Sequence, residues 1–295
     1  MKEDILFPRA PDQHKPNRPL VPNGLGVFYV IISAFYTFLL YFYGMAYYPN
    51  GISAPLTLAA CILFGGFMGL LDDWIDLKWR YKAFLPLIAA IPLVTFAIKV
   101  GARTSIALPL LGTIHFGPLY YFIIIPVLVT IITNTVNQLG GLNGLETICP
   151  AIVMVGLMAI SSSFAILLLC PLIVWLILAF FNFRGQIFVG NTGSFAVGIT
   201  LASFAIITDV KFDLVISVLP YIFNSALILL TFFFYRTKAN VSFDGERLVS
   251  DHRRSLITLV SFNRPLTERQ IVIVISLLVA ATTFVAVLAR LLLDL

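Results

Sequence analysis

Residues 69–82 read Gly69-Leu-Leu-Asp72-Asp73-Trp-Ile-Asp76-Leu-Lys78-Trp-Arg80-Tyr-Lys82, so three carboxylates and three cations follow an apolar run long enough to cross a membrane. If that run is a helix, the negative end of its dipole lies beside the carboxylates, which costs a few tenths to about 1 kcal/mol for each Asp. A cation is therefore expected nearby, and a divalent metal is the first candidate. The alternative is that the three cations of the same stretch neutralise the carboxylates.

The whole chain has the composition of a polytopic membrane protein. Its 295 residues are 60% hydrophobic and 11% charged, with a mean hydropathy of +0.99, whereas soluble domains are roughly 25% charged. We expect one all-α membrane domain over residues 1–295, a helical bundle of about nine transmembrane helices, with a short β-hairpin in the loop 101–117. The predicted spans lie near 25–47, 54–71, 83–100, 118–134, 147–162, 163–181, 194–208, 213–235 and 270–293.

The distribution of positive charge predicts the orientation. If the N-terminus is cytoplasmic, every one of the 19 Lys and Arg lies on the inside except Lys99, Arg103, Lys211 and Arg290. Residues 1–23 are then a cytoplasmic N-terminal segment without an apolar signal-peptide core, so the mature chain is expected to begin near Met1. Residues 236–269 form a cytoplasmic basic loop, and we expect a multi-pass protein of the plasma membrane.

Two further polar clusters fall on that same side. The first reads Asn134-Thr-Val-Asn137-Gln-Leu-Gly140-Gly141-Leu-Asn143-Gly144-Leu-Glu146; its two leading Asn share a helical face, and its glycines let the backbone approach a ligand closely. These groups suit a metal-bound diphosphate or a nucleobase, although hydrogen bonding between helices is an alternative. The second, 184–194, contains Asn191-Thr192-Gly193-Ser194 before an apolar run, which is typical of a helix cap and also of an anion site.

The basic loop is the fourth polar cluster, with His252-Arg253-Arg254 at its middle. It is either a solvated determinant of topology or a flexible cationic loop that closes over phosphates. We interpret the net charge of +5 first as a determinant of the orientation of the protein in the membrane. Nothing in the sequence beyond this charge supports nucleic-acid binding. The three His and three Cys are scattered, which argues against a histidine metal site and against a disulfide framework.

Together, residues 72–82 and the run Asn134-x-x-Asn137-x-x-Gly-x-Asn143-Gly144-Leu145-Glu146 closely resemble eukaryotic and archaeal UDP-GlcNAc:dolichyl-phosphate GlcNAc-1-phosphotransferases. These belong to the polyprenyl-phosphate hexosamine-1-phosphate transferases, in glycosyltransferase family 4. The resemblance extends from Lys15-Pro-Asn-Arg18 to the last span, with Phe188-Val-Gly190-x-Thr192 and Phe223-Asn224 as further matches.

The resemblance implies a single displacement in which a polyprenyl or dolichyl phosphate attacks the β-phosphorus of UDP-GlcNAc, releasing UMP and leaving lipid-diphosphate-GlcNAc. Mg²⁺ is the implied cofactor, with Mn²⁺ as an alternative, and a homodimer is left open. The implied catalytic residues are Asp72, Asp73 and Lys82; the implied metal ligands are Asp73, Asn137 and Asn191; and the implied substrate-binding residues are Asn134, Asn143, Gly144, Glu146, Phe188, Arg236, Lys238 and Arg254.

Two features depart from the family pattern. The chain has Gly190-Asn191-Thr192 where the family has Gly-Asp-Thr, which removes one negative charge from the expected metal site. The family commonly has ten spans, whereas we expect nine here, without the family's helix before Lys15. The loop lacks the His-rich motif of the muramoyl-peptide branch, which favours UDP-GlcNAc as substrate. A catalytically silent homologue and a polytopic transporter or lipid-binding protein remain the alternatives.

Overall fold

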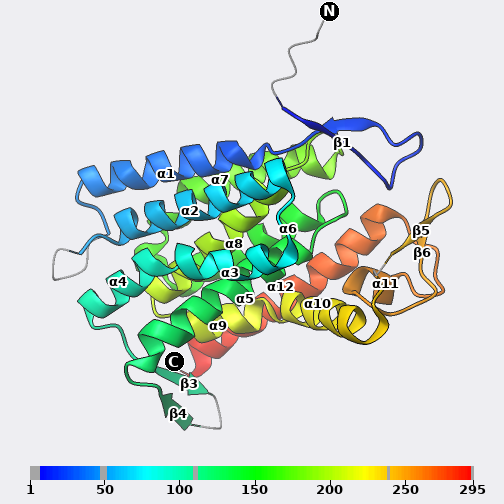
Figure 1. The fold of residues 1–295 in the computed structure, drawn as a ribbon. Helices are drawn as coiled ribbons and strands as arrows, with labels where there is room; N and C mark the ends of the chain where they lie inside the picture. Colours follow the sequence, from blue (N-terminus) through cyan, green and yellow to red (C-terminus); the bar gives the residue numbers. More distant parts are fainter. Residues whose placement is uncertain (1–6, 47–51, 109–111, 238–239, 294–295) are drawn as a thin grey trace, which may run out of the picture.

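The computed structural model describes residues 7–46, 52–108, 112–237 and 240–293, and confirms the expected all-α bundle (Figure 1). Six helical segments in this part of the chain are long and apolar enough to cross a membrane, and a bent pair makes a seventh. Two shorter apolar helices account for the other predicted spans. The helices are α1 (Gly26–Phe42), α2 (Ala54–Ile75), α3 (Trp79–Ala89), α4 (Ile91–Val100), α5 (Ile125–Gln138), α6 (Leu145–Ile160), α7 (Ile166–Phe183), α8 (Gly190–Ile207), α9 (Lys211–Ser217), α10 (Leu219–Leu230), α11 (Leu256–Val260) and α12 (Glu268–Leu293), with the short helical turns η1 (Tyr120–Ile124), η2 (Ser162–Phe164) and η3 (Thr231–Tyr235).

The predicted span 213–235 is broken rather than straight. α9 meets the helix formed by α10 and η3 at an angle of 62°. Pro220 lies in the first turn of α10, where its missing N–H is tolerated but where it cannot continue a preceding helix. The predicted span 213–235 is therefore not one straight helix but a pair of helices bent at this point.

Helix α8 forms the centre of the bundle. Every residue from Thr192 to Ile207 is buried, and α8 packs against α1, α2, α5, α6 and α9. Glycines permit this close packing: a Cβ on Gly69 of α2 would lie 2.3 Å from the Asn191 carbonyl oxygen, and one on Gly26 of α1 would lie 2.2 Å from the Gly193 Cα. Small residues at helix contacts are the usual means of close approach in membrane bundles.

Replacing Gly69 by Ala is expected to lower stability by about 1–3 kcal/mol, because the new methyl group must push the backbone of α8 away from α2. Thermal unfolding of the purified protein in detergent would measure this. The control is Leu63→Ala, on an exposed part of the same helix. An equal or smaller loss for Gly69→Ala than for the control would contradict the close packing of α2 on α8.

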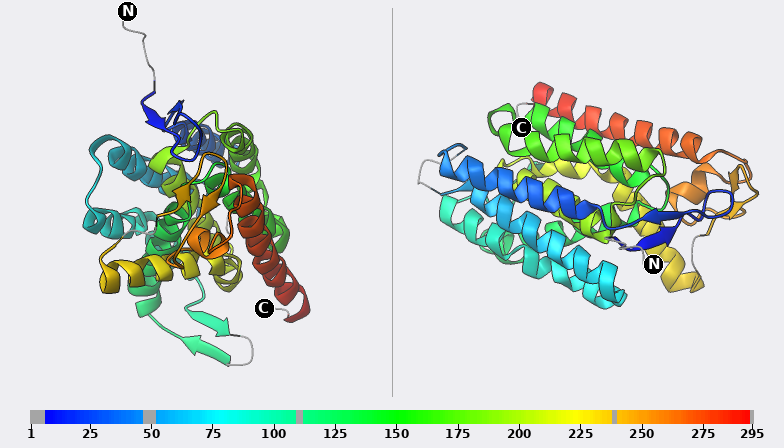
Figure 2. Two further views of the ribbon diagram at one scale, coloured as in Figure 1. Left: turned by 90° about the vertical axis from the view of Figure 1, so that its right-hand side faces the viewer. Right: turned by 90° about the horizontal axis from the view of Figure 1, so that it is seen from above.

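The two ends of the bundle differ (Figures 1 and 2). One end carries the predicted hairpin, confirmed as β3 (Ser105–Leu108) paired with β4 (Gly112–His115). At the other end, an antiparallel pair formed by β1 (Arg9–Pro11) and β2 (Leu20–Pro22) lies near the loop that contains β5 (Ser242–Phe243) and β6 (Leu248–Val249). We call residues 7–25 the N-terminal strap. It is fixed by two backbone hydrogen bonds with Phe188, just before α8: the Leu25 N–H donates to the Phe188 carbonyl, and the Phe188 N–H donates to the Pro22 carbonyl.

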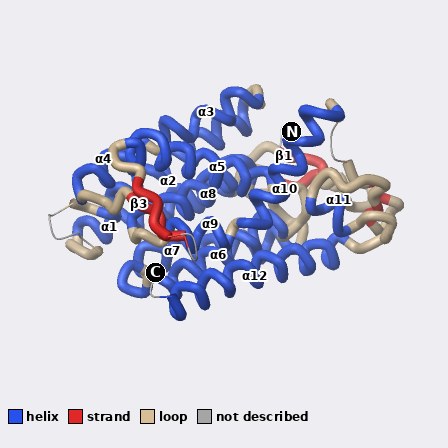
Figure 3. Tube along the Cα trace, turned by 90° about the horizontal axis from the view of Figure 1, so that it is seen from below, coloured by secondary structure: helices blue, strands red, loops and turns tan. Residues whose placement is uncertain are grey.

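All four predicted polar clusters lie at the end that carries the strap. α2 and α5 end there, while α6, α8 and α12 begin there, with α12 running the length of the bundle (Figure 3). The first and last described residues lie at opposite ends of the bundle (Figure 1). This agrees with an odd number of crossings.

Candidate active site

A cavity of about 460 Å³ opens at the end of the bundle that carries the strap. Its volume lies within the range of sites for drug-sized ligands. The strap, the end of α5, the turn before α6 and the start of α8 all contribute to its wall. The lining residues are Pro11, Asp12, Gln13, His14, Asn23, Asp73, Asn137, Gln138, Gly140, Gly141, Leu142, Asn143, Glu146, Phe188, Gly190, Asn191 and Ser194.

Asp73 lies in the last turn of α2 and caps the N-terminus of α8. Its carboxylate accepts hydrogen bonds from the backbone N–H groups of Asn191 and Thr192, both at 2.9 Å, and from the Thr192 hydroxyl at 2.7 Å. A negative group at a helix N-terminus is favoured by the free N–H donors and by the helix dipole. Asp73 thus joins α2 to the central helix at the wall of the cavity.

The predicted cap within residues 191–194 is wrong in its details. The span was expected to begin at 194, but α8 begins at Gly190, and no side chain of its own N-cap residue makes a capping bond. The carboxylate of Asp73 replaces that cap from another helix. The Asp73 carboxylate accepts hydrogen bonds from the backbone N–H groups of Asn191 and Thr192, so these donors are not free to bind a phosphate. An anion site at this helix end would require free donors.

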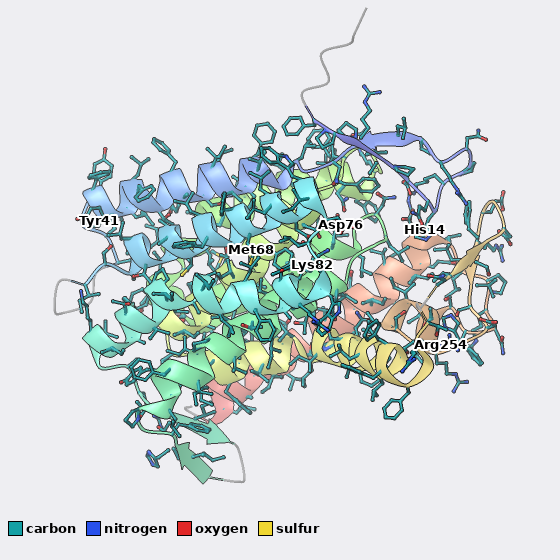
Figure 4. The ribbon with its side chains drawn as sticks, viewed as in Figure 1. His14, Tyr41, Met68, Asp76, Lys82 and Arg254 are labelled. Atoms are coloured by element: carbon teal, nitrogen blue, oxygen red, sulfur yellow. The ribbon has the colours of Figure 1, made fainter. Side chains whose placement is uncertain are left out.

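Asp72 is paired with a cation from the next helix. The Lys82 amino group lies 2.9 Å from the buried Asp72 carboxylate and 3.4 Å from Asp76, whose side chain is exposed (Figure 4). The cation expected beside this helix end is therefore present in the chain itself. One Asp72 oxygen, Oδ2, is buried and has no hydrogen-bond partner within the described part of the chain. Neither Asp72 nor Lys82 is among the residues that line the cavity.

The two Asn side chains of α5 have different surroundings. Asn137 lines the cavity, and its amide oxygen accepts a hydrogen bond from the Ser194 hydroxyl at 2.6 Å. Asn134 donates to the carbonyl of Thr130 one turn earlier in its own helix and does not line the cavity. Asn134 and Asn137 share a helical face, as expected from their spacing, but only Asn137 lines the cavity.

Gly144 contributes through its backbone rather than as part of the cavity wall. It precedes α6 with a φ of +96°, and a Cβ there would lie 2.6 Å from the ring of Phe183. Its N–H donates to the fully buried Asn182 side chain at 2.8 Å. Asn182, which lies in an otherwise apolar span and was not among the predicted residues, therefore holds the turn that presents Asn143 and Glu146 to the cavity.

The structure adds two carboxylates that the motifs did not predict. Asp12 in the strap and Glu268 at the start of α12 both accept hydrogen bonds from the Asn143 side chain, at 2.7 and 3.1 Å. Lys15 forms an ion pair with Glu268 at 2.7 Å. In the sequence, the only indication of the contact between Lys15 and Glu268 was that Lys15 begins the segment Lys15-Pro-Asn-Arg18, where the resemblance to the family starts.

The loop cations do not reach the cavity wall. Arg236 is exposed at the end of η3, and Arg254 donates to the Thr237 hydroxyl at 2.8 Å on the loop beyond α10 (Figure 4). Neither lines the cavity. Lys238 lies outside the described residues.

The donor set at the cavity fits Mg²⁺. Asp73, Asn137 and Asn191 all line it, and Mg²⁺ prefers oxygen ligands, commonly one or two carboxylates together with water and substrate phosphates. Asp73 Oδ1 and Asn137 Oδ1 each accept one hydrogen bond from the protein, so each keeps acceptor capacity. The three residues offer one negative charge, so a phosphate-bearing ligand would complete such a site.

Comparisons with known proteins agree with the sequence motifs. The Glycosyl transferase family 4 profile matches residues 55–209, which run from α2 to the end of α8. A protein of Saccharolobus solfataricus is 29% identical over 292 residues, covering 95% of this chain and 87% of its own, and one of Sulfolobus acidocaldarius is 32% identical over 217 residues, covering 70% of this chain and 64% of its own. A protein of Schizosaccharomyces pombe is 32% identical over 201 residues, covering 60% and 45%.

The Schizosaccharomyces protein carries the name UDP-N-acetylglucosamine–dolichyl-phosphate N-acetylglucosaminephosphotransferase, and the Saccharolobus and Sulfolobus proteins carry the same name with the prefix "Putative". The chain spans less than two thirds of the Sulfolobus and Schizosaccharomyces proteins. The profile match covers just over half of this chain, including the last turns of α2 and α5 and the first turn of α8, which build the cavity. This multi-pass membrane protein therefore belongs to glycosyl transferase family 4.

Proposed function

We propose that this chain transfers GlcNAc-1-phosphate from UDP-GlcNAc to a polyprenyl or dolichyl phosphate in the membrane, releasing UMP and forming lipid-diphosphate-GlcNAc. Such a product would begin the assembly of a glycan of the N-glycosylation type. The observation that carries the proposal is the cavity at the membrane-flanking end of the bundle, where Asp73, Asn137 and Asn191 meet. The names of the relatives supply the substrates.

The reaction needs positioning and charge neutralisation more than a general base, because the phosphate nucleophile is already ionised. Asp73 and Asn137 would hold Mg²⁺, together with the Asn191 side chain. When bound, Mg²⁺ would neutralise the diphosphate and orient it. Phe188 and the turn around Asn143 would form the nucleoside end of the cavity. Lys82, whose amino group is paired with Asp72 off the cavity wall, is assigned to the phosphates by the family resemblance.

The orientation of the active site is part of the proposal. Positive charge is concentrated on the loops at the end that carries the cavity, which by the positive-inside rule is cytoplasmic. A soluble sugar nucleotide would then enter from the cytoplasm, while the carrier phosphate would approach from the membrane at the same level.

The test is release of UMP by the purified protein given UDP-GlcNAc, dolichyl phosphate and Mg²⁺. We expect UMP only when lipid and metal are both present, with EDTA and lipid-free samples as controls. No UMP from folded protein, with several sugar nucleotides and carriers, would instead favour the catalytically silent homologue. A transporter would release no UMP and would move labelled substrate across sealed vesicles.

The Asn191→Asp variant tests whether residue 191 faces the metal. A carboxylate there adds a negative charge beside Asp73, so the variant should bind Mg²⁺ more tightly and need less of it for half-maximal rate. Without metal, repulsion between the two carboxylates should lower the melting temperature, and Mg²⁺ should restore it. An unchanged Mg²⁺ requirement together with an unchanged melting temperature would place the side chain of residue 191 away from the metal.

A further inference from the structure

Asn143 is held at the cavity by two carboxylates from distant parts of the chain. Its side-chain nitrogen donates to Asp12 Oδ2 at 2.7 Å and to Glu268 Oε1 at 3.1 Å, and its backbone N–H donates to the same Glu268 oxygen at 2.7 Å. All three residues are buried. Asp12 lies on the strap beside His14, which Figure 4 shows over the start of α12, so the strap and the start of the last helix meet at one amide.

These contacts fix which way the amide faces. An ionised carboxylate can only accept hydrogen bonds, and the Glu268 carboxylate also forms an ion pair with Lys15. If the Asn143 amide were turned over, its oxygen would face two carboxylate oxygens at hydrogen-bonding distance, which is repulsive. Asp12 and Glu268 therefore hold the nitrogen toward themselves and the oxygen away.

The oxygen of the same amide lacks a donor. Asn143 lines the cavity and is 4% exposed, and its Oδ1 is buried with no hydrogen-bond partner among the residues that the structure describes. A buried acceptor left unpaired is costly, and such groups in proteins are nearly always satisfied by a partner, water or ligand. A ligand that offers an N–H group at this point would complete the set.

We propose that Asp12 and Glu268 are positioning residues that lock Asn143 as a hydrogen-bond acceptor, so that the cavity selects a uracil base over a cytosine base. Uracil carries an N–H at ring position 3, whereas cytosine has a lone pair there, which would face the Asn143 oxygen without a proton between them. This inference rests on the proposed function, because it takes the ligand to be a pyrimidine nucleotide. It adds the residues that set the base preference and the reason for it.

The test compares binding of UMP and CMP to the full-length protein purified in detergent. The wild-type protein is expected to prefer UMP by roughly 10-fold or more, the effect of one buried group left without its partner. In Glu268→Gln and in Asp12→Asn, the new amide can donate as well as accept, so Asn143 can turn over. Each variant should reduce the preference for UMP at least about 3-fold, and the double variant should reduce it further.

The control is Lys15→Gln, which breaks the same ion pair with Glu268 but leaves both carboxylates on Asn143; it should keep the preference for UMP. Unchanged UMP-to-CMP ratios in the folded single variants would overturn the inference while leaving the proposed function intact. If the wild type bound neither nucleotide, both would fail. If Glu268→Gln does not fold, Asp12→Asn decides the outcome, because Asp12 lies on the strap outside the helical bundle.

Discussion

Asp73→Asn is expected to reduce transfer by about 10²- to 10³-fold, comparable to the loss of one preorganised electrostatic group at an active site. Asp73 is the single carboxylate among the three proposed metal ligands, and an amide at this position leaves the cavity wall with one negative charge fewer. Initial rates of UMP release at saturating Mg²⁺ would measure the effect. Asp251→Asn, which alters an exposed carboxylate on the basic loop, is the matched control.

The same substitution should also weaken the protein, because the carboxylate accepts three hydrogen bonds at the start of α8. An amide has one acceptor oxygen, so at least one donor loses its partner, at a cost of about 1–3 kcal/mol. The variant should still insert into membranes, since the apolar run of α2 before Asp72 is unchanged. A rate within a few-fold of wild type would remove Asp73 from the catalytic site.

Lys82→Ala is expected to have the second largest effect, on both stability and transfer. Without its amino group the buried Asp72 keeps one hydrogen bond, from the Leu77 backbone N–H at 2.9 Å. Leaving a buried charge without its partner costs about 3–5 kcal/mol, and the lower end is expected because the Lys82 side chain is 27% exposed. Thermal unfolding and the rate of UMP release would measure the two losses separately.

The double variant Lys82→Ala with Asp72→Asn separates folding from function. Removing both charges should recover most of the lost stability, because no buried ion remains unpaired. Transfer should stay low if Lys82 contacts the phosphates. Recovery of transfer together with stability would show that the ion pair serves only the fold.

The helices were predictable because each span carries its own signal in about 20 consecutive apolar residues. Pro220 also marked the break before α10 in the sequence. A count of consecutive apolar residues does not detect this break, because proline does not interrupt an apolar run. The start of α8 was misplaced by four residues because its N–H groups are capped by Asp73, 118 positions earlier. Such a cap leaves no local pattern.

The candidate site was predictable where its residues lie in recognised motifs. Asp73, Asn137, Asn143, Glu146, Phe188 and Asn191 all meet at the cavity. Asp12 and Glu268 were missed because their contacts with Asn143 span 131 and 125 positions, and neither stands in a pattern that distinguishes it from other charged residues. The arginines of the basic loop were assigned to the phosphates from the family resemblance, and in this structure Arg236 and Arg254 lie off the cavity wall.

The central claim is that the bond broken lies between the two phosphates of the sugar nucleotide. UDP-GlcNAc labelled with ³²P at the β-phosphate, incubated with the purified protein, dolichyl phosphate and Mg²⁺, tests it most directly. Transfer of GlcNAc-1-phosphate predicts that the label moves into the organic-soluble lipid, while label at the α-phosphate stays in water-soluble UMP. Label from both positions released together as UDP would show transfer of the sugar alone and would contradict the proposal.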